Sequence, residues 1–478
     1  MNSNFFPRDE YFMRLALREA TRALEHDDIP VGAIVVQNGE VIGSGHNERE
    51  LRCDPTAHAE VIVGYSRAVP ASVTADLQWR EPSRAIVSAA TSEIRVVHLR
   101  RGLTVAAAIV SLRRRPGVAF AEPNFIAHAA GGWYPDDQGL THRAGGWQAM
   151  QWNFLPAAGV NAPIAWQNLL ADHHPGGRGV TVAILDTGVA YRSWQQFRRS
   201  PDFTGTRFVA PYDFVDNSRY PVDRNGHGTF VAGLVAEATN NRIGLTGLAY
   251  GASIMPVRVL DASGEGSETT IARGIRYAVS HGAEVINLSL EFSPGEVTSG
   301  AEIPDIIKAI DFAHSRRVVV VAAAGNDQTD QLAYPARAPS VISVGATTSD
   351  RCLANYSNGG AGLDLVAPGG GDDAALQGDS DCHPDRNLPS IHQLTLVDPP
   401  RWGRFGYPSD EIGTSMSSPE VAATAALVIA SGVIGRHPTP DQILARLEQT
   451  AVGLGGSQPN QSYGYGLLDA GAATASGP

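Results

Sequence analysis

The chain has 478 residues, of which 43% are hydrophobic, and a formal net charge of −12 at pH 7. This acidic balance argues against a broad nucleic-acid-binding surface, because such a surface needs clustered cations. No apolar run is long enough to span a membrane, and residues 1–10 lack the basic start and apolar core of a signal peptide. We therefore expect neither a nucleic-acid nor a membrane partner, and a monomeric protein.

The first 63 residues predict a helix followed by a β-hairpin. Apolar residues recur at helical spacing over residues 9–26. Val31–Val36 and Glu40–Ile42 read as two strands, joined by the turn Asn38-Gly39, which is a strong hairpin signal.

The stretch Asp54-Pro55-Thr56-Ala57-His58-Ala59-Glu60 resembles the front half of tRNA adenosine deaminases and related zinc nucleobase deaminases. The resemblance implies that His58 is a zinc ligand, that Glu60 shuttles protons and that Asn47 contacts substrate. The second motif of that family, P-C-x-x-C, supplies the other zinc ligands, and this chain lacks it. Because a catalytic zinc needs about three protein ligands, we predict a truncated, vestigial deaminase-like fragment at residues 1–63. An active zinc-dependent deaminase is the alternative.

Residues 64–93 show no clear period and are interpreted as a linker. A strand at residues 94–99, a helix beginning after Thr104 and a strand over Val118–Phe125 follow. This order resembles the C-terminal half of a subtilisin-like protease propeptide, so residues 94–130 are predicted to be a partial propeptide. Residues 131–178 are interpreted as a connector, exposed up to about residue 148, and a lead-in segment.

From Gly179 onward, short continuous apolar runs alternate with amphipathic helical patterns such as residues 268–280 and 303–315. Continuous apolar strands covered by helices on both faces predict an α/β fold with a doubly wound, mostly parallel sheet. In such sheets the active site lies beyond the carboxyl ends of the strands. The predicted strands are Val180–Leu185, Met255–Leu260, Val285–Leu290, Val318–Ala323, Val341–Val344 and Leu363–Ala367.

Four polar residues stand at predicted strand ends or helix starts. Asp186 closes the first strand, His227 begins a helix, Asn326 follows a strand, and Ser415 stands between Gly413 and an apolar helix. Acyl transfer needs these residue types: a serine nucleophile, a histidine base, an aspartate that orients the histidine, and an amide donor for the oxyanion. Each residue alone could be an ordinary turn or cap, but the four together favour catalysis.

Residues 179–475 resemble the subtilisin-like serine proteases, or subtilases. The resemblance rests on Asp186-Thr187-Gly188, Asn225-Gly226-His227-Gly228-Thr229, Ala324-Gly325-Asn326 and Gly413-Thr414-Ser415-Met416. It implies a serine endopeptidase that cleaves polypeptides through an acyl-enzyme on Ser415, with no cofactor in the chemistry. It also implies a secreted or extracytoplasmic protein and self-cleavage near residues 128–131. The alternative from another class is a non-catalytic binding protein built on a protease scaffold.

The same resemblance predicts how substrate is held. Ser289 and Leu290 match the strand that binds the substrate main chain, and Asp327 matches a position lining the first subsite. Glu291 replaces the usual glycine of the family. Two carboxylates near the cleft would favour Lys or Arg side chains through modest, salt-screened attraction.

A calcium site is also implied. The stretch Asn240–Leu245 resembles a subtilase calcium loop, and hard oxygen donors suit Ca²⁺. The expected ligands are the side chains of Asp202 and Asn241 and the carbonyls of Thr239, Ile243 and Leu245. A simple polar turn is the alternative.

Further departures from the family pattern are a long Gly-, Asp- and Pro-rich insertion at residues 369–409, and Glu420 where many members have histidine. Because Cys352 lies before the insertion and Cys382 within it, and subtilases usually work outside the cell, we predict a disulfide between them. Cys53 would then be a free thiol.

Overall fold

The computed structural model describes residues 132–374 and 389–476 continuously, and shorter segments elsewhere (32–37, 40–46, 60–65, 86–88, 91–98, 105–115, 118–123, 376, 379, 381, 382 and 384). The chain divides into two compact units, one of residues 1–129 and 143–145, the other of residues 130–142 and 146–478. They are described separately. Within the described residues, no helix combines the length and apolar character needed to cross a membrane.

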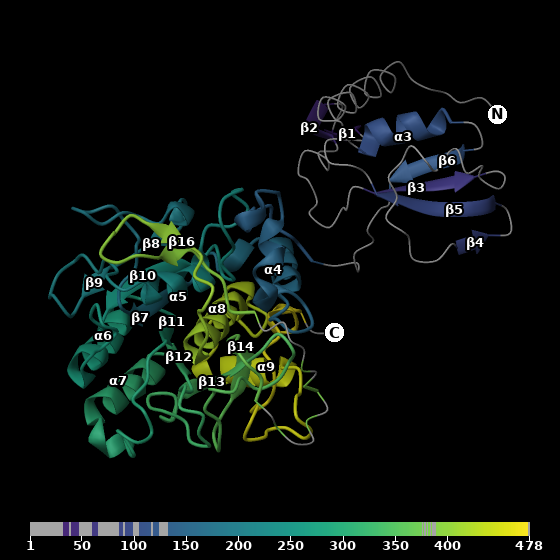
Figure 1. Ribbon diagram of the computed structural model, residues 1–478. Coiled ribbons are helices and arrows are strands. Elements are labelled where there is room, and N and C mark those ends of the chain that lie inside the picture. Colours follow the sequence, from purple (N-terminus) through teal and green to yellow (C-terminus); the bar gives the residue numbers. More distant parts are fainter. Residues whose placement is uncertain are drawn as a thin grey trace. The chain divides into compact units, whose positions relative to one another are not determined.

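The second unit is built on an eight-stranded sheet whose paired strands are all parallel (Figure 1). The strand order is β14-β13-β12-β11-β7-β10-β8, with β9 also paired to β10. Each apolar run predicted from the sequence is a strand, so the predicted sheet is confirmed. The strands are β7 (Thr181–Asp186), β8 (Arg207–Phe208), β9 (Tyr212–Asp213), β10 (Ser253–Arg258), β11 (Val285–Leu288), β12 (Val319–Ala323), β13 (Val341–Thr347) and β14 (Leu365–Pro368).

Helices cover both faces of this sheet. Ala183 and Leu185 of β7 pack in one buried cluster with helices α6 (Glu268–Ser280) and α7 (Pro304–Ser315). The alternate residues Val182 and Ile184 pack in the other cluster with α4 (Ala162–Ala171), α5 (His227–Ala236) and α8 (Thr414–Ser431). Side chains alternate between the faces of a strand, so one continuous apolar run fills both cores, as the doubly wound prediction requires. Helices α9 (Pro440–Thr450) and α10 (Ala470–Thr474) complete the unit.

The start of this unit differs from the sequence prediction. Residues 131–148 were expected to form an exposed connector, but Trp147 and Asp137 are fully buried. The Trp147 ring lies 5.6 Å from Trp166 of α4, and Trp133 lies 5.9 Å from the same ring. The glycines and polar residues suggested a loop, whereas long-range aromatic packing makes this stretch part of the core.

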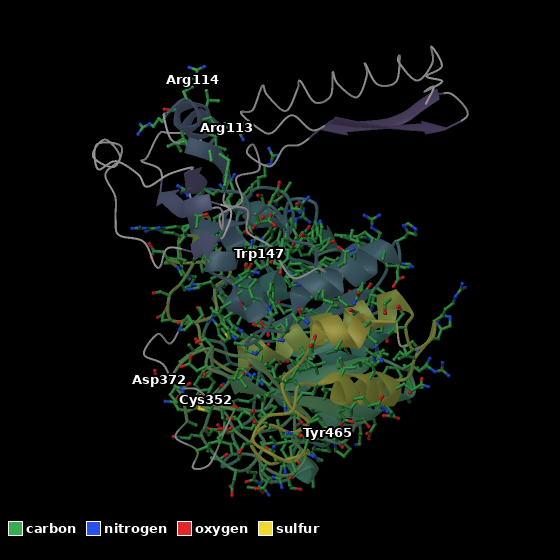
Figure 2. All side chains as sticks on the ribbon, turned by 90° about the vertical axis from the view of Figure 1, so that its right-hand side faces the viewer. Arg113, Arg114, Trp147, Cys352, Asp372 and Tyr465 are labelled. Carbon is green, nitrogen blue, oxygen red and sulfur yellow. A yellow bond between two sulfur atoms is a disulfide. The ribbon has the colours of Figure 1, made fainter. Side chains whose placement is uncertain are left out.

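The insertion before α8 is also integrated into the fold. It carries the short antiparallel hairpin β15 (Thr395–Leu396) and β16 (Phe405–Gly406), and both residues of β15 are buried. Cys352 and Cys382 form the predicted disulfide, with Cα atoms 4.4 Å apart; Figure 2 labels Cys352. Cys53 lies outside the described residues.

The first unit contains a four-stranded antiparallel sheet in the order β4-β5-β3-β6 and the helix α3 (Val105–Arg113). A separate hairpin pairs β1 (Gly32–Gln37) with β2 (Glu40–His46). The strands of the sheet are β3 (Glu60–Tyr65), β4 (Ile86–Ser88), β5 (Thr91–His98) and β6 (Val118–Pro123).

The sheet of the first unit differs from the linker expected over residues 64–93. Strand β3 crosses the expected boundary at residue 63 and is the central partner of β5 and β6, and β4 also lies in this range. Glu60 is the first residue of β3, whereas His58 and Asn47 lie outside the described residues. A six-residue strand between polar flanks gives a weak sequence signal, because its pairing partners lie far along the chain.

Candidate active site

Ser415 and His227 open onto one cavity of about 670 Å³ at the carboxyl ends of the central strands. His227 is the first residue of α5, and its Nδ1 lies 2.8 Å from Oδ1 of Asp186, the last residue of β7. Asp186 is fully buried, whereas 23% of the His227 side chain is exposed. The imidazole is therefore anchored from behind and presents its other edge to solvent and to the cavity.

The electrostatics of this pair favour the charged imidazole. Burial by itself would lower the pKa of His227, but the charge of Asp186 and its hydrogen bond outweigh burial and raise that pKa to about 9. Glu411, four residues before Ser415, adds a smaller contribution in the same direction. A proton taken up by His227 is thus stabilised where it would arise during acyl transfer.

Asp223 fixes the loop that leads into α5, and the sequence prediction missed it. Its Oδ1 accepts hydrogen bonds from the N–H groups of Asn225 and Gly226 and from the Thr187 hydroxyl, next to Asp186. Its Oδ2 accepts from the N–H and hydroxyl of Thr229. This buried carboxylate ties the start of α5 to the end of β7, and so it sets the position of His227 relative to Asp186. An Asp two residues before Asn225-Gly226 was the available sequence signal.

The insertion reaches the same helix. The Thr395 hydroxyl of β15 donates to the carbonyl of Gly226, directly before His227. A side chain at Gly233 of α5 would meet Gln393 at 2.6 Å, so the glycine makes room for the insertion. The segment whose role the sequence left open therefore packs on the helix that carries His227.

Asn326 and Ser415 are brought together by α8. Gly413 has φ 143°, a conformation that favours glycine, and α8 begins at the next residue. The N–H and hydroxyl of Thr414 donate to Oδ1 of Asn326 at 2.9 and 3.1 Å. These bonds fix the amide by its oxygen, and Nδ2 makes a longer hydrogen bond to Oε1 of Glu291 at 3.4 Å. The N–H of Ser415 lies in the first turn of α8, where it has no acceptor within the helix.

The predicted substrate-binding edge lies beside Ser415. Ser289 and Leu290 line the same cavity, and the Ser289 hydroxyl donates to the carbonyl of Ser415 at 2.8 Å. Within the described part of the chain, Leu290 and Glu291 make no main-chain hydrogen bond. Their N–H and C=O groups are available to pair with an extended peptide.

Asp327 lies near this edge but is held away from the cavity. Its Oδ1 accepts from the Ser293 hydroxyl at 3.1 Å, and its Oδ2 accepts from Nδ2 of Asn358 at 3.2 Å. The residues found to line the cavity include Glu291, and they do not include Asp327. Glu291 and Asp327 were both expected near the cleft, and Glu291 is the one that faces the cavity.

The predicted calcium loop surrounds buried carboxylates. Asp202 is fully buried, and its oxygens accept from Nδ2 of Asn241 at 2.8 Å and from the N–H of Leu245 at 2.9 Å. Oδ1 of Asn241 accepts from the N–H of Ile243. The side chains of Asp202 and Asn241, which were predicted to be calcium ligands, therefore accept hydrogen bonds from N–H groups of the loop.

The predicted main-chain ligands are free. The carbonyls of Thr239, Ile243 and Leu245 accept no hydrogen bond from the described residues. No group of three or more His, Cys, Asp or Glu side chains in the described residues is placed to hold a metal ion. A cation at this loop would thus depend on carbonyl oxygens as well as on Asp202.

Two further buried acids lie near this loop and were missed from the sequence. Asp137 accepts from the N–H groups of Asn240 and Asn241, while both carboxylate oxygens of buried Glu237 have no partner. Burial, and to a smaller degree the neighbouring carboxylates, raise the pKa of Asp137 to about 7 and that of Asp202 to about 8. The same causes raise the pKa of Glu237. An oxygen-rich site of this kind suits a hard cation, whose charge would favour the ionised carboxylates.

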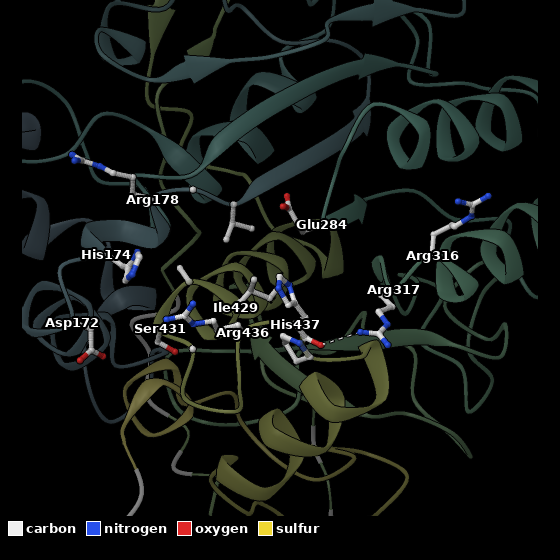
Figure 3. A pocket seen from close by; sticks show the side chains of 15 residues that line it. Asp172, His174, Arg178, Glu284, Arg316, Arg317, Ile429, Ser431, Arg436 and His437 are labelled. Atoms are coloured by element: carbon white, nitrogen blue, oxygen red, sulfur yellow. Dashed lines mark hydrogen bonds between the residues drawn. The ribbon is translucent and has the colours of Figure 1, made fainter.

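A larger hollow of about 1060 Å³ lies at the opposite ends of the strands (Figure 3). Its lining residues Val180 and Glu284 directly precede β7 and β11. It contains four arginines but neither Ser415 nor His227. Because the residues suited to acyl transfer gather at the carboxyl ends, the smaller cavity is the candidate active site.

Comparison with known proteins identifies the family of this chain as one of serine endopeptidases. The chain belongs to the subtilase family, whose model matches residues 177–466. A model of the fervidolysin N-terminal prodomain matches residues 57–124, and one of the cytidine and deoxycytidylate deaminase zinc-binding region matches residues 7–69. The predicted recognition of a subtilase with propeptide-like and deaminase-like regions is confirmed.

Individual relatives agree. The chain is 35% identical to a thermophilic serine proteinase from Bacillus sp. (strain AK1), over 75% of this chain and 74% of that protein. It is 35% identical to thermitase from Thermoactinomyces vulgaris, over 62% of this chain and 88% of thermitase. Among solved structures, a protease of Pseudoalteromonas arctica PAMC 21717 matches with a TM-score of 0.57 and 30% identity, covering 72% of this chain and 99% of that chain.

Proposed function

We propose that Ser415, His227 and Asp186 are the catalytic triad of this endopeptidase and that Asn326 is an oxyanion donor. The observation that carries the proposal is the 2.8 Å contact between His227 and buried Asp186, at the cavity that Ser415 also lines. As the Ser415 oxygen attacks the peptide carbonyl, His227 takes the hydroxyl proton. His227 then gives this proton to the leaving amine. Asp186 holds the imidazole in place and stabilises its positive form.

The oxyanion that forms on the attacked carbonyl needs donors fixed in advance. Nδ2 of Asn326 and the N–H of Ser415 would supply them, since Thr414 holds the Asn326 amide by its oxygen. Water then attacks the acyl-enzyme, with His227 again acting as base, and releases the acid product.

The test is hydrolysis of denatured casein and of a short peptide by the wild type and by Ser415→Ala. We expect the variant to fold normally, because the change creates no large cavity, and to lose hydrolysis. A serine-directed phosphonate should label the wild type on Ser415. Near-normal turnover by Ser415→Ala would show that the triad assignment is wrong.

A zinc-dependent deaminase is disfavoured on ligand count. The matched zinc-binding region contains His58, but the chain has only three cysteines and no CxxC pair to complete the site. Metal analysis of the full chain should find no stoichiometric zinc. A non-catalytic binding protein is disfavoured because the complete set of Asp, His, Asn and Ser is present.

We also propose that the loop at residues 239–245 holds a structural calcium ion, with Asp202, Asn241 and the carbonyls of Thr239, Ile243 and Leu245 as ligands. Three free carbonyls and an uncompensated group of buried carboxylates support this. A bound Ca²⁺ would offset the negative charge there and take no part in the reaction.

Calcium binding is tested by thermal unfolding in the Ser415→Ala background, with excess Ca²⁺ or with a chelator. Ligand at 100 times its Kd stabilises the folded state by about 2.7 kcal/mol, so we expect a clear rise in Tm with Ca²⁺. Asp202→Asn should lose this rise, whereas the exposed Asp172→Asn should keep it. An equal rise in all three proteins would contradict the proposed ligands.

We also propose that the protein is extracytoplasmic. The disulfide between Cys352 and Cys382 supports it, because disulfides persist mainly in oxidising compartments. Alkylation of free thiols in freshly harvested cells tests this location. A fully reduced Cys352 and Cys382 pair in the producing cell would contradict it.

A further inference from the structure

Glu291 makes direct contact with the proposed oxyanion donor. Its Oε2 accepts a hydrogen bond from the main-chain N–H of Asn326 at 3.0 Å, and its Oε1 accepts a longer one from Nδ2 at 3.4 Å. A side chain at Gly325 would meet Oε2 of Glu291 at 2.5 Å. The glycine before Asn326 thus leaves the space that the carboxylate occupies.

This contact puts negative charge where the reaction also develops it. The Asn326 amide has two Nδ2 hydrogens, and its oxygen is held by Thr414, so the Glu291 carboxylate and an oxyanion would share one donor group. The Glu291 carboxylate and the oxyanion are both negative, and they repel one another in a partly desolvated cavity. Unless its charge is compensated, Glu291 therefore opposes the transition state that Asn326 stabilises.

The described residues that line the cavity include no Lys or Arg whose side chain could pair with Glu291. The acidic residues that line it are Glu265, Glu291 and Glu296. Asp327 lies close enough to act on Glu291 electrostatically, and it is also an acid. His227 is the basic group in the cavity, and its Nδ1 is engaged by Asp186. The cation must come from the substrate.

The position of Asn326 indicates which substrate residue supplies it. The oxyanion belongs to the residue whose carbonyl Ser415 attacks, so the side chain of that residue emerges close to the Asn326 amide. Glu291 contacts the same amide and lines the cavity. A Lys or Arg side chain on the acyl side of the scissile bond can therefore pair with Glu291.

We propose that Glu291 is a specificity-determining residue that couples recognition of Lys or Arg on the acyl side of the scissile bond to release of the Asn326 amide. With a cationic side chain bound, the carboxylate pairs with the substrate and Nδ2 turns fully to the oxyanion. With a neutral or acidic side chain, Glu291 keeps its bond to Asn326 and its charge disfavours the transition state. The inference rests on the proposed roles of Ser415 and Asn326.

The test compares the wild type, Glu291→Gln and Asp330→Asn on peptides that differ only in the acyl-side residue: Arg, Leu or Glu. Asp330 is an exposed acid on the loop after Asn326, outside the cavity lining, so its variant is a control for loss of one charge. We expect the wild type to prefer Arg over Leu by roughly tenfold or more in kcat/KM. Glu291→Gln should lose this preference and gain kcat on Leu, whereas Asp330→Asn should resemble the wild type.

A gain in kcat of Glu291→Gln on the Leu peptide would indicate that Glu291 acts through Asn326. Simple charge attraction between Glu291 and the substrate would instead change mainly the KM for the Arg peptide. An unchanged Arg-to-Leu ratio in Glu291→Gln, or an equal loss in Asp330→Asn, would overturn the proposal. A second measurement needs no variant: the Arg-to-Leu ratio of the wild type should fall as NaCl is raised, and a ratio of one at every salt concentration would also overturn it.

A phosphonate with a neutral acyl-side group distinguishes failure of this inference from failure of the triad assignment. Absence of label on Ser415 in every protein would refute the proposed catalytic serine. Labelling of Ser415 at the same rate in the wild type and in Glu291→Gln would leave the triad standing and refute the role of Glu291.

Discussion

At the scale of single residues, the proposed catalytic site contains amide and carboxylate groups that are anchored by the fold. Asp186 is held at the end of β7 and is fully buried, so its bond to His227 competes with little water. Asn326 is exposed, but its oxygen is fixed by two donors from Thr414. Both groups are therefore anchored before the reaction, and under the proposed role of Glu291 only Nδ2 of Asn326 changes its partner.

Replacement of Asn326 by Ala should lower kcat with little change in KM. The lost donor acts on the oxyanion and not on the bound peptide, so the loss should be about 10²- to 10³-fold, or about 2.7–4 kcal/mol, the range established for the oxyanion amide of subtilisin itself. Steady-state kinetics on a peptide substrate measure both constants. A change confined to KM would place Asn326 in substrate binding instead.

The pH dependence of kcat/KM should show an alkaline requirement. His227 must be neutral to accept the Ser415 proton, and its pKa is raised to about 9, so activity is lost as the pH falls through that value. Glu411→Gln removes one of the charges that raise this pKa, and it should therefore move the acidic limb of the profile to lower pH. Asp410→Asn, which changes the neighbouring exposed acid, should leave the limb in place; a limb that is identical in all three proteins would contradict a role for Glu411.

At the scale of elements, α8 carries both Ser415, the proposed nucleophile, and a buried acid. Glu420 is fully buried in α8, and its Oε1 accepts from Nδ2 of Asn153 at 2.6 Å while its Oε2 has no partner. Burial raises the pKa of Glu420 well above its ordinary value. The folded protein therefore holds a proton that the unfolded chain releases near pH 4.5.

Glu420→Gln should stabilise the protein at high pH relative to the wild type. An acid with a raised folded-state pKa contributes its full stability below the unfolded value and loses it as the pH rises. The gap between the wild type and the variant should thus widen in favour of Gln by up to about 1.4 kcal/mol per pH unit. Urea unfolding of both proteins at pH 5 and pH 8, in the Ser415→Ala background, measures this; a gap that does not depend on pH would contradict a protonated Glu420. Glu296→Gln, an exposed change of the same kind, is the control.

The sequence predicted these elements well where the signal is local. The apolar runs of β7 and β10–β14 and the helical pattern of α6 lie within single segments, and their burial on both faces follows from composition. The predicted disulfide is confirmed. The four proposed catalytic residues stay a prediction, which rests on family motifs in single short segments.

What the sequence could not show were contacts between distant segments. Asp223 reads as a turn residue, yet it organises the start of α5. Glu291 reads as a departure from the family pattern, and nothing in its neighbours reveals a bond to Asn326, 35 residues away. Trp147 lies among glycines that suggest a loop, yet it is buried against aromatic rings that include the distant Trp166.

At the scale of the whole molecule, the catalytic unit begins before the lead-in segment expected from the sequence. The N–H of Trp133 donates to the carbonyl of Pro163 at 2.8 Å, and its ring lies 5.6 Å from that of Tyr250. The prodomain match ends at residue 124. A cut between residues 124 and 131 would therefore release the prodomain-like segment and leave the core of the catalytic unit intact.

Self-cleavage in this interval is the last prediction. The connecting residues follow a prodomain-like sheet and precede the first packed residues of the protease, and a segment between two units is a preferred site of proteolysis. Cleavage would remove the deaminase-like region together with the prodomain-like unit, so His58 and Glu60 would be absent from the mature enzyme. N-terminal sequencing of the purified wild type should give a start between residues 125 and 132, while Ser415→Ala should remain uncut. A wild-type chain that is intact and fully active would show that the first unit is not an inhibitory leader, and a cut that also appears in Ser415→Ala would assign the cleavage to another protease.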